Sequence, residues 1–360
     1  PGSGGSIIGT AGSQLVINQD NTARTFAGSI GGAVNLVRSG QNTLTLVSPN
    51  TYTGTTLING NTTNLQSSGS LSGTTAIDIN YSTLVIDNNT GLNDSTDRIN
   101  DAASIALRGS TLTLTGRVQT ASSEVLGAVS IAQGFNVINS NAGGTGVNSA
   151  DLSLASLSRP GGSSATFFAN GTNLGTIGSN GRITVTTLNG VATTNPAYSA
   201  NGSGLTNNLV GGWAISNNDF LTYIPGLGLA PLNQTGAAQY DLTNTFVGGV
   251  STDNVRLTAN TTVPNGGSTV NAVSMTGSAI NIAFATGTDT LNITSGGLIG
   301  PNNNQTIGAT LDSGRITAGG LTPAANSDLY VYNRANTLTI NSRIIDNTNG
   351  GSSSVRSVFT

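Results

Sequence analysis

One short segment of the chain gathers acidic side chains closely enough to suggest chemistry. The run "NDSTDRIND" places Asp94, Asp97 and Asp101 around Arg98. Clustered carboxylates supply the oxygen ligands that Ca²⁺ needs, and with an arginine they could also act on a polysaccharide. The same residue types are typical of a polar turn, in which the arginine pairs with a neighbouring carboxylate. Because no EF-hand or glycine-rich calcium repeat surrounds the run, the turn is favoured, and Asp94, Asp97 and Asp101 are a weak calcium candidate.

The residue types that most enzymes use are missing from the chain. There is no His, no Cys and no Lys, and Glu124 is the single Glu. These absences exclude the Ser-His-Asp arrangement, thiol and Schiff-base catalysis, Walker-type phosphate loops and metals held by His or Cys. We therefore expect that the protein is not an enzyme, that it has no catalytic residue and that it uses no cofactor.

Aromatic side chains concentrate in residues 205–250, although aromatics make up only 4% of the chain. The segment contains Trp213, Phe220, Tyr223, Tyr240 and Phe246. One interpretation, which we favour, is a local hydrophobic plug or a lateral excursion packed on the rest of the protein. The other is a contact surface, because aromatic rings stack on sugars and anchor subunit interfaces. These five rings are therefore interface candidates.

A repeated sequence motif, which we call the repeated phrase, indicates which elements position these groups. The run "IDINYSTLVID" of residues 77–87 aligns without a gap with "IALRGSTLTLT" of residues 105–115. Each copy holds two short aliphatic alternations, and a Ser-Thr pair precedes the second. A fixed unit repeated with variable spacers is typical of a stacked architecture.

Strand signals dominate the rest of the chain. Alternating Val, Ile, Leu and Thr run over four to six residues and end at Gly, Asn, Asp and Ser clusters. A helical pattern is weakly present only around residues 121–129. Gly and Asn tolerate the left-handed backbone that sharp turns require, and stacked Asn side chains can form amide ladders. The sequence thus predicts an all-β protein with little or no α-helix.

Composition narrows the function classes. Of 360 residues only 8% are charged, the net charge is −3, and the 12 cationic residues are all Arg spread along the chain. Nucleic-acid binding therefore has no electrostatic basis. No run of 18 apolar residues is present, so we expect no membrane-spanning helix. The lack of Cys suits an exported protein, and the first residues show no signal segment, so we expect a mature product or a piece of a longer protein.

Residues 36–71 resemble the autotransporter-associated β-strand repeat of bacterial surface proteins. The resemblance rests on Ser39-Gly40 before a strand at residues 43–47, and on the run Asn50-Thr51-Tyr52-Thr53-Gly54 before a second strand. Residues 97–116 look like the coil that commonly follows, whereas residues 120–200 are similar only in composition. The resemblance implies secretion, a right-handed parallel β-helix (β-solenoid) and surface display. It implies no catalytic residues.

Together these observations predict three regions: β-helix coils in residues 1–204, an aromatic interruption in residues 205–250, and further coils in residues 251–360. We expect an extracellular or cell-surface structural protein, namely a β-helical rod serving as a fibre or filament subunit, an adhesin passenger or a matrix component. Expected partners are copies of itself, which would meet partly through Val355, Val358 and Phe359, and surface glycans. The alternative is a carbohydrate-binding or polysaccharide-cleaving β-helix.

Overall fold

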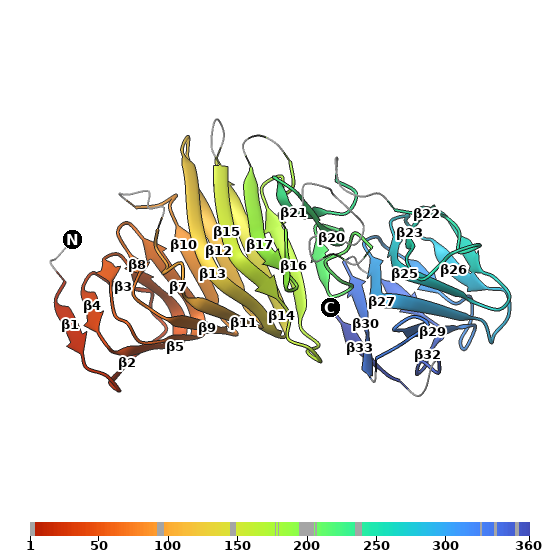
Figure 1. Ribbon diagram of the computed structural model, residues 1–360, viewed down its shortest axis with the longest axis horizontal. Coiled ribbons are helices and arrows are strands. Elements are labelled where there is room, and N and C mark those ends of the chain that lie inside the picture. Colours follow the sequence, from red (N-terminus) through yellow and green to blue (C-terminus); the bar gives the residue numbers. More distant parts are fainter. Residues whose placement is uncertain are drawn as a thin grey trace. The chain divides into compact units, whose positions relative to one another are not determined.

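The computed structural model describes residues 4–91, 97–144, 149–176, 178, 180–193, 205, 207–234, 240–324, 326–334, 337–349 and 353–360. In these ranges every regular element is a β-strand, which confirms the expected all-β class (Figure 1). The weak helical pattern around residues 121–129 lies in a strand instead. The described residues contain no helix of the length and apolarity that crossing a membrane requires.

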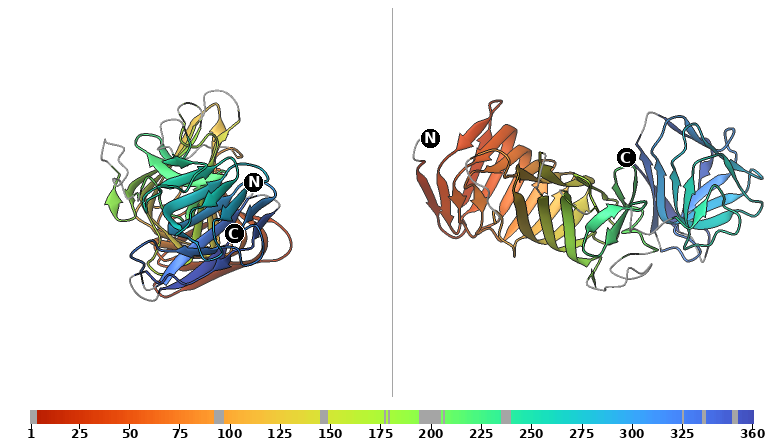
Figure 2. Two further views of the ribbon diagram at one scale, coloured as in Figure 1. Left: turned by 90° about the vertical axis from the view of Figure 1, so that its right-hand side faces the viewer. Right: turned by 90° about the horizontal axis from the view of Figure 1, so that it is seen from above.

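The chain folds as two compact units. The first comprises residues 1–198, 202–204 and 224–230, and the second comprises residues 199–201, 205–223 and 231–360. In each unit, strands that are distant in sequence lie side by side (Figure 2). Most of the aromatic segment 205–250 therefore belongs to the second unit.

The strands of the first unit stack in parallel, apart from one short antiparallel pair. Its strands are β1 (Ser6–Gly9), β2 (Gln14–Gln19), β3 (Arg24–Phe26), β4 (Ser29–Gly32), β5 (Asn35–Leu46), β6 (Pro49–Asn50), β7 (Thr56–Gln66), β8 (Ser70–Leu71), β9 (Ala76–Asn80), β10 (Thr83–Asp87), β11 (Ser104–Arg108), β12 (Thr111–Val118), β13 (Ala121–Gln133), β14 (Phe135–Gly143), β15 (Ser149–Ser158), β16 (Thr166–Gly171), β17 (Gly181–Leu188), β18 (Val191–Ala192) and most of β21 (Gly228–Pro231). One column of parallel pairs runs β5, β7, β9, β11, β13, β15 and β17. A second column continues β7 through β10, β12, β14 and β16.

The two copies of the repeated phrase stack directly on each other. Ile77 pairs with Ile105 in the β9–β11 register, and Leu84 pairs with Leu112 in the β10–β12 register. All four side chains are at most 1% exposed. Burying an aliphatic side chain of this size contributes roughly 1.5–3 kcal/mol, so like residues repeated in register build a continuous apolar core.

The Asn-Thr-Tyr-Thr-Gly run also has a structural role. The buried Asn50 side chain accepts the backbone N–H of Ile30 at 3.0 Å and donates to the Ser70 carbonyl at 3.1 Å, which joins the neighbouring segments on both sides. The Tyr52 hydroxyl lies 2.5 Å from Thr56 Oγ1 in the core, and burial raises the pKa of Tyr52. The motif therefore fixes a turn by hydrogen bonds between layers.

The second unit repeats this construction. Its strands are β19 (Ala214–Ser216), most of β20 (Asp219–Ile224), β22 (Leu242–Thr243), β23 (Asn254–Leu257), β24 (Thr261–Val263), β25 (Ser268–Met275), β26 (Asn281–Phe284), β27 (Thr290–Gly300), β28 (Gln305–Ile307), β29 (Arg315–Ala318), β30 (Asn326–Asn333), β31 (Leu338–Ile340), β32 (Arg343–Ile344) and β33 (Ser354–Phe359). Val255, Val273, Leu298 and Val331 follow one another in parallel register and line the core.

Asparagine occupies many of the turns, as the composition predicts. Of the 13 non-glycine residues with positive φ in the described ranges, 8 are Asn. Amide pairs also connect layers, with Asn80 Nδ2 3.2 Å from Asn59 Oδ1 and Asn271 Nδ2 2.8 Å from Asn254 Oδ1. These turns and amide pairs between layers account for the abundance of Asn.

Candidate functional site

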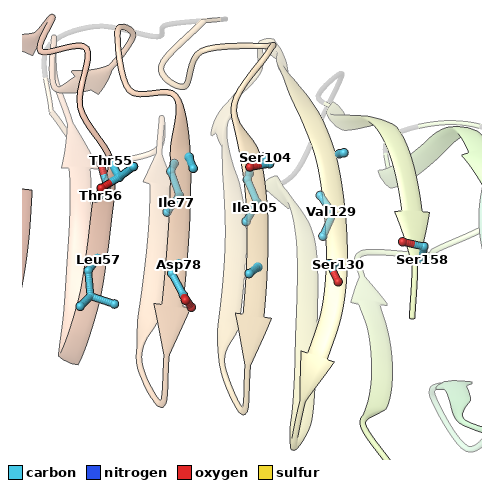
Figure 3. A pocket seen from close by; sticks show the side chains of 13 residues that line it. Thr55, Thr56, Leu57, Ile77, Asp78, Ser104, Ile105, Val129, Ser130 and Ser158 are labelled. Atoms are coloured by element: carbon cyan, nitrogen blue, oxygen red, sulfur yellow. The ribbon is translucent and has the colours of Figure 1, made fainter. Parts of the chain in front are cut away.

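A shallow groove crosses the face of four neighbouring strands in the first unit. Its volume is about 530 Å³, and residues of β7, β9, β11 and β13 line it together with Ser158 of β15. Figure 3 shows the lining side chains projecting from adjacent parallel strands. One row follows the register from strand to strand: Leu57, Asp78, Ala106, Ser130 and Ser158.

The groove can hold a ligand but offers little for catalysis. Asp78 is the one titratable side chain among the described residues that line it. Its carboxylate accepts hydrogen bonds from Arg108 Nε at 3.0 and 3.1 Å, so the charge is already balanced at the rim. General acid and base work needs a group that is free to exchange a proton at the reacting atom, and here the other lining side chains are small or aliphatic.

The predicted acidic cluster is only partly described. Asp94 lies outside the described residues, whereas Asp97 and Asp101 are both exposed. Among the residues that the structure describes, no three His, Cys, Asp or Glu side chains come together as a metal site requires. The calcium site, which depends on Asp94, stays a prediction.

Arg98, which the sequence analysis places in a polar turn, lies inside the protein. Its side chain is fully buried, and its guanidinium donates to Asn88 Oδ1 at 2.9 Å and to the Gly69 carbonyl at 2.7 Å. Its backbone N–H donates to both carboxylate oxygens of Glu124 at 3.1 Å, and the Ile99 N–H donates to Oε1 at 2.8 Å. This residue therefore links layers inside the protein.

Glu124, the single glutamate, is equally buried. Burial raises the pKa of its carboxyl to about 7, and the charge of Asp97 adds to this, while the N–H donors and Arg98 act in the opposite direction. The sequence marks Glu124 as unusual, but its contact with a segment 25 and 26 residues earlier depends on the strand register. The geometry indicates a structural carboxyl.

The buried guanidinium of Arg38 binds backbone carbonyls where the pairing of β5 is irregular. The register of β5 against β7 shifts between Gly40 and Thr43. Arg38 Nη1 donates to the Gly40 carbonyl at 2.8 Å and Nη2 donates to the Thr62 carbonyl at 3.1 Å. Burial lowers the pKa of Arg38. Sequence reasoning missed this residue, whose alternation with Leu36 gave it no distinguishing signal.

The aromatic candidates of residues 205–250 lie mostly inside the second unit. Trp213, Phe220, Tyr223 and Phe246 are 7%, 0%, 5% and 1% exposed. They expose almost no ring surface on which a sugar or a subunit could stack, which agrees with a packed hydrophobic segment. The contact role assigned to them stays a prediction without surface area to support it.

Tyr240, the fifth of these rings, completes a buried hydrogen-bond network. Its hydroxyl donates to Asp219 Oδ1. The same carboxylate accepts the N–H of Phe220 at 2.8 Å and the N–H of Asn233 at 3.1 Å. Burial raises the pKa of Asp219 and that of Tyr240. The network fastens β20 to the segments after it.

The C-terminal candidates lie on an edge strand. β33 pairs with β30, and no second partner lies beside it among the described residues. Val355 and Val358 are half-buried, while Phe359 is 63% exposed and borders a hollow of about 380 Å³ with Leu338 and Ile340. The start of this edge is covered, because Ser353 bridges to Asn347 and the Val355 N–H donates to Asp346 Oδ1 at 2.9 Å. The later part of the strand, among the described residues, presents an open backbone edge next to an apolar ring.

Comparison of the chain with family models, with curated proteins and with solved structures finds no match in any of the three.

Proposed function

We propose that this protein is a right-handed parallel β-helix that serves as an extracellular structural protein. It would be the rod of a surface fibre or filament, an adhesin passenger or a matrix component. The observation that carries the proposal is the in-register parallel stacking of the two copies of the repeated phrase. Such stacking requires the chain to return to the same position after each repeat, as in a β-helix.

Such a scaffold functions through its mechanical rigidity. Backbone hydrogen bonds between parallel strands resist extension along the stack, and buried aliphatic rows resist sliding because a shifted register would break their packing. The outward positions carry amides and hydroxyls and few charges. The same composition, free of Cys, supports export to the cell exterior.

Self-association belongs to this proposal. An unpaired strand edge is a template for another strand, and charges near the edge normally prevent such pairing. β33 combines an open edge with the exposed Phe359. A second copy would add its own strand there.

Electron microscopy of negatively stained protein tests the proposal. We expect elongated particles of constant width, whose length grows when copies associate. Compact particles with no long axis would contradict it. Retention of the particle form in a variant with Asp97→Ala and Asp101→Ala would support a scaffold that does not depend on calcium at that cluster.

A further inference from the structure

An exposed tyrosine interrupts a column of glycines at one turn of the first unit. Gly40 pairs with Gly60 in the β5–β7 register. In the next layers the Tyr81 N–H donates to the Arg108 carbonyl at 2.9 Å, and the Gly109 N–H donates to the Gln133 carbonyl at 2.6 Å. In the repeated phrase, Tyr81 stands where the second copy has Gly109.

The backbone at Tyr81 shows why this position favours glycine. Its φ is +48°, in the left-handed region, as are those of Gly109 and Gly134 at +62° and +67°. A bulky side chain in that conformation is strained, and residues held under strain concentrate at functional sites. The tyrosine thus occupies a position where a glycine would cause less backbone strain.

The ring of Tyr81 is nevertheless 66% exposed and held in place. A Cβ on Gly109 would lie 2.8 Å from the Tyr81 ring, so the ring rests directly on the glycine backbone. Gln133 Nε2 donates to the Tyr81 hydroxyl at 3.1 Å. A side chain fixed on two sides loses little conformational freedom when a ligand binds.

Two further rings lie in layers that follow along the stack. Phe135, 39% exposed, follows Gln133 by two residues, and its ring stacks on Phe168 with centroids 6.5 Å apart and planes inclined by 19°. The glycines between the rings are closely packed, since a Cβ on Gly134 would lie 3.0 Å from Gly109 Cα. We call Tyr81, Phe135 and Phe168 the ring platform.

We propose that the ring platform binds a neutral, β-linked glycan chain. Sugars joined in this way are flat and present C–H groups on their faces, which pack on aromatic rings, while their edge hydroxyls need amide and hydroxyl partners. Gln133 and Asn80 supply amides beside Tyr81. The nearby charges, Asp78 and Arg108, pair with each other, which favours an uncharged ligand over an acidic one.

The geometry of the stack suits an extended chain. Strands in a sheet repeat about every 4.8 Å, a spacing comparable with one β-linked sugar unit. Tyr81 directly follows β9, whose Asp78 lines the groove of Figure 3, whereas Phe135 of β14 and Phe168 of β16 lie on strands that do not line it. This site does not rest on the scaffold function, because binding and particle form are measured separately.

Isothermal titration of the whole protein with cellohexaose, xylohexaose, mannohexaose and chitohexaose tests the site. We expect at least one to bind, and Tyr81→Gly and Phe135→Ala each to weaken that binding at least tenfold. Tyr81→Gly relieves the left-handed strain, so its unfolding midpoint should not fall below that of the unchanged protein. Leu311→Ala, which alters an apolar side chain that is 81% exposed elsewhere, should leave binding unchanged.

Three outcomes would overturn the proposal. One is that none of the four oligosaccharides binds. Another is that binding persists in both ring variants, which would place the glycan elsewhere. If Tyr81→Gly instead abolishes association between copies of the protein in sedimentation, with no effect on any sugar, the platform is a contact between copies and the glycan site is wrong.

Discussion

At the scale of single residues, the buried Glu124 makes stability depend on pH. Its pKa rises from 4.5 to about 7 in the folded protein because burial favours the neutral carboxyl. The folded state therefore binds more protons than the unfolded state between those pH values. The free energy of unfolding must fall as pH rises through this window, by up to roughly 3 kcal/mol at about 1.4 kcal/mol per unit.

Glu124→Gln removes this titration while preserving the shape of the side chain. We expect the unchanged protein to be less stable at pH 8 than at pH 5 in urea unfolding, and the difference to shrink in the variant. Asp101→Asn, which alters an exposed carboxyl, should keep the difference. Equal stability of the unchanged protein at the two pH values would show that the N–H donors of Arg98 and Ile99 offset burial completely.

Tyr240 supports a second buried carboxylate. Tyr240→Phe removes the hydroxyl donor to Asp219 and leaves that acceptor less satisfied, so the free energy of unfolding should fall by about 1–3 kcal/mol. Tyr81→Phe is the matched control, because its hydroxyl bonds at an exposed position and its loss should cost less than about 0.5 kcal/mol. Equal losses from the two variants in thermal unfolding would contradict a special role for Tyr240.

At the scale of elements, close approach between layers requires glycine at defined positions. A Cβ on Gly60 would lie 2.3 Å from the Gly40 carbonyl oxygen and 2.5 Å from Arg38 Nη1, so Gly60→Ala must displace the backbone or the buried guanidinium. We expect a loss of about 1–3 kcal/mol in chemical unfolding. Gly161→Ala meets nothing within 4 Å and should be nearly neutral. A neutral Gly60→Ala would mean that β5 and β7 separate easily.

The strands were more predictable than their irregularities. The phrase copies predicted layers that the register confirms, since Ile77 and Leu84 stack on their counterparts. The weak helical pattern within β13 arose because Gly127 breaks the alternation of buried and exposed positions. A Cβ there would lie 2.2 Å from the Ala103 carbonyl, a contact between layers that local sequence does not reveal.

The candidate site shows the same limit. When the two copies of the repeated phrase are aligned, Tyr81 is the one residue of the first copy that stands opposite a glycine, Gly109. Its significance nevertheless depends on the contact of its ring with Gly109 in the folded protein. The acidic run was conspicuous, but burial of Arg98 against Gly69 depends on contacts across 29 residues. Composition identified unusual residues, and only the register determined their neighbours.

At the scale of the whole molecule, the chain divides into two compact units, and the three regions expected from the sequence stay a prediction. The aromatic segment looked separate because its composition differs, but Phe246 belongs to the same buried cluster as Val255 and Val270. Hydrophobic burial joins a segment to a core wherever its apolar side chains fit, whatever its local composition. Only 8% of the residues are charged, and this low fraction affects how copies of the protein interact when they approach each other.

Few charges mean weak repulsion, so an open edge should promote association. We expect the mean mass in light scattering to rise with protein concentration for the unchanged chain. Phe359→Lys places a charge beside the edge of β33 and should lower that mass, because pairing would then bury an unpaired ammonium. Leu311→Lys adds the same charge at a site that is 81% exposed, away from β33 in sequence, and should change the mass far less. If both variants reduce the mass equally, net charge rather than the β33 edge governs association, and a chain that stays monomeric at every concentration would exclude the edge contact altogether.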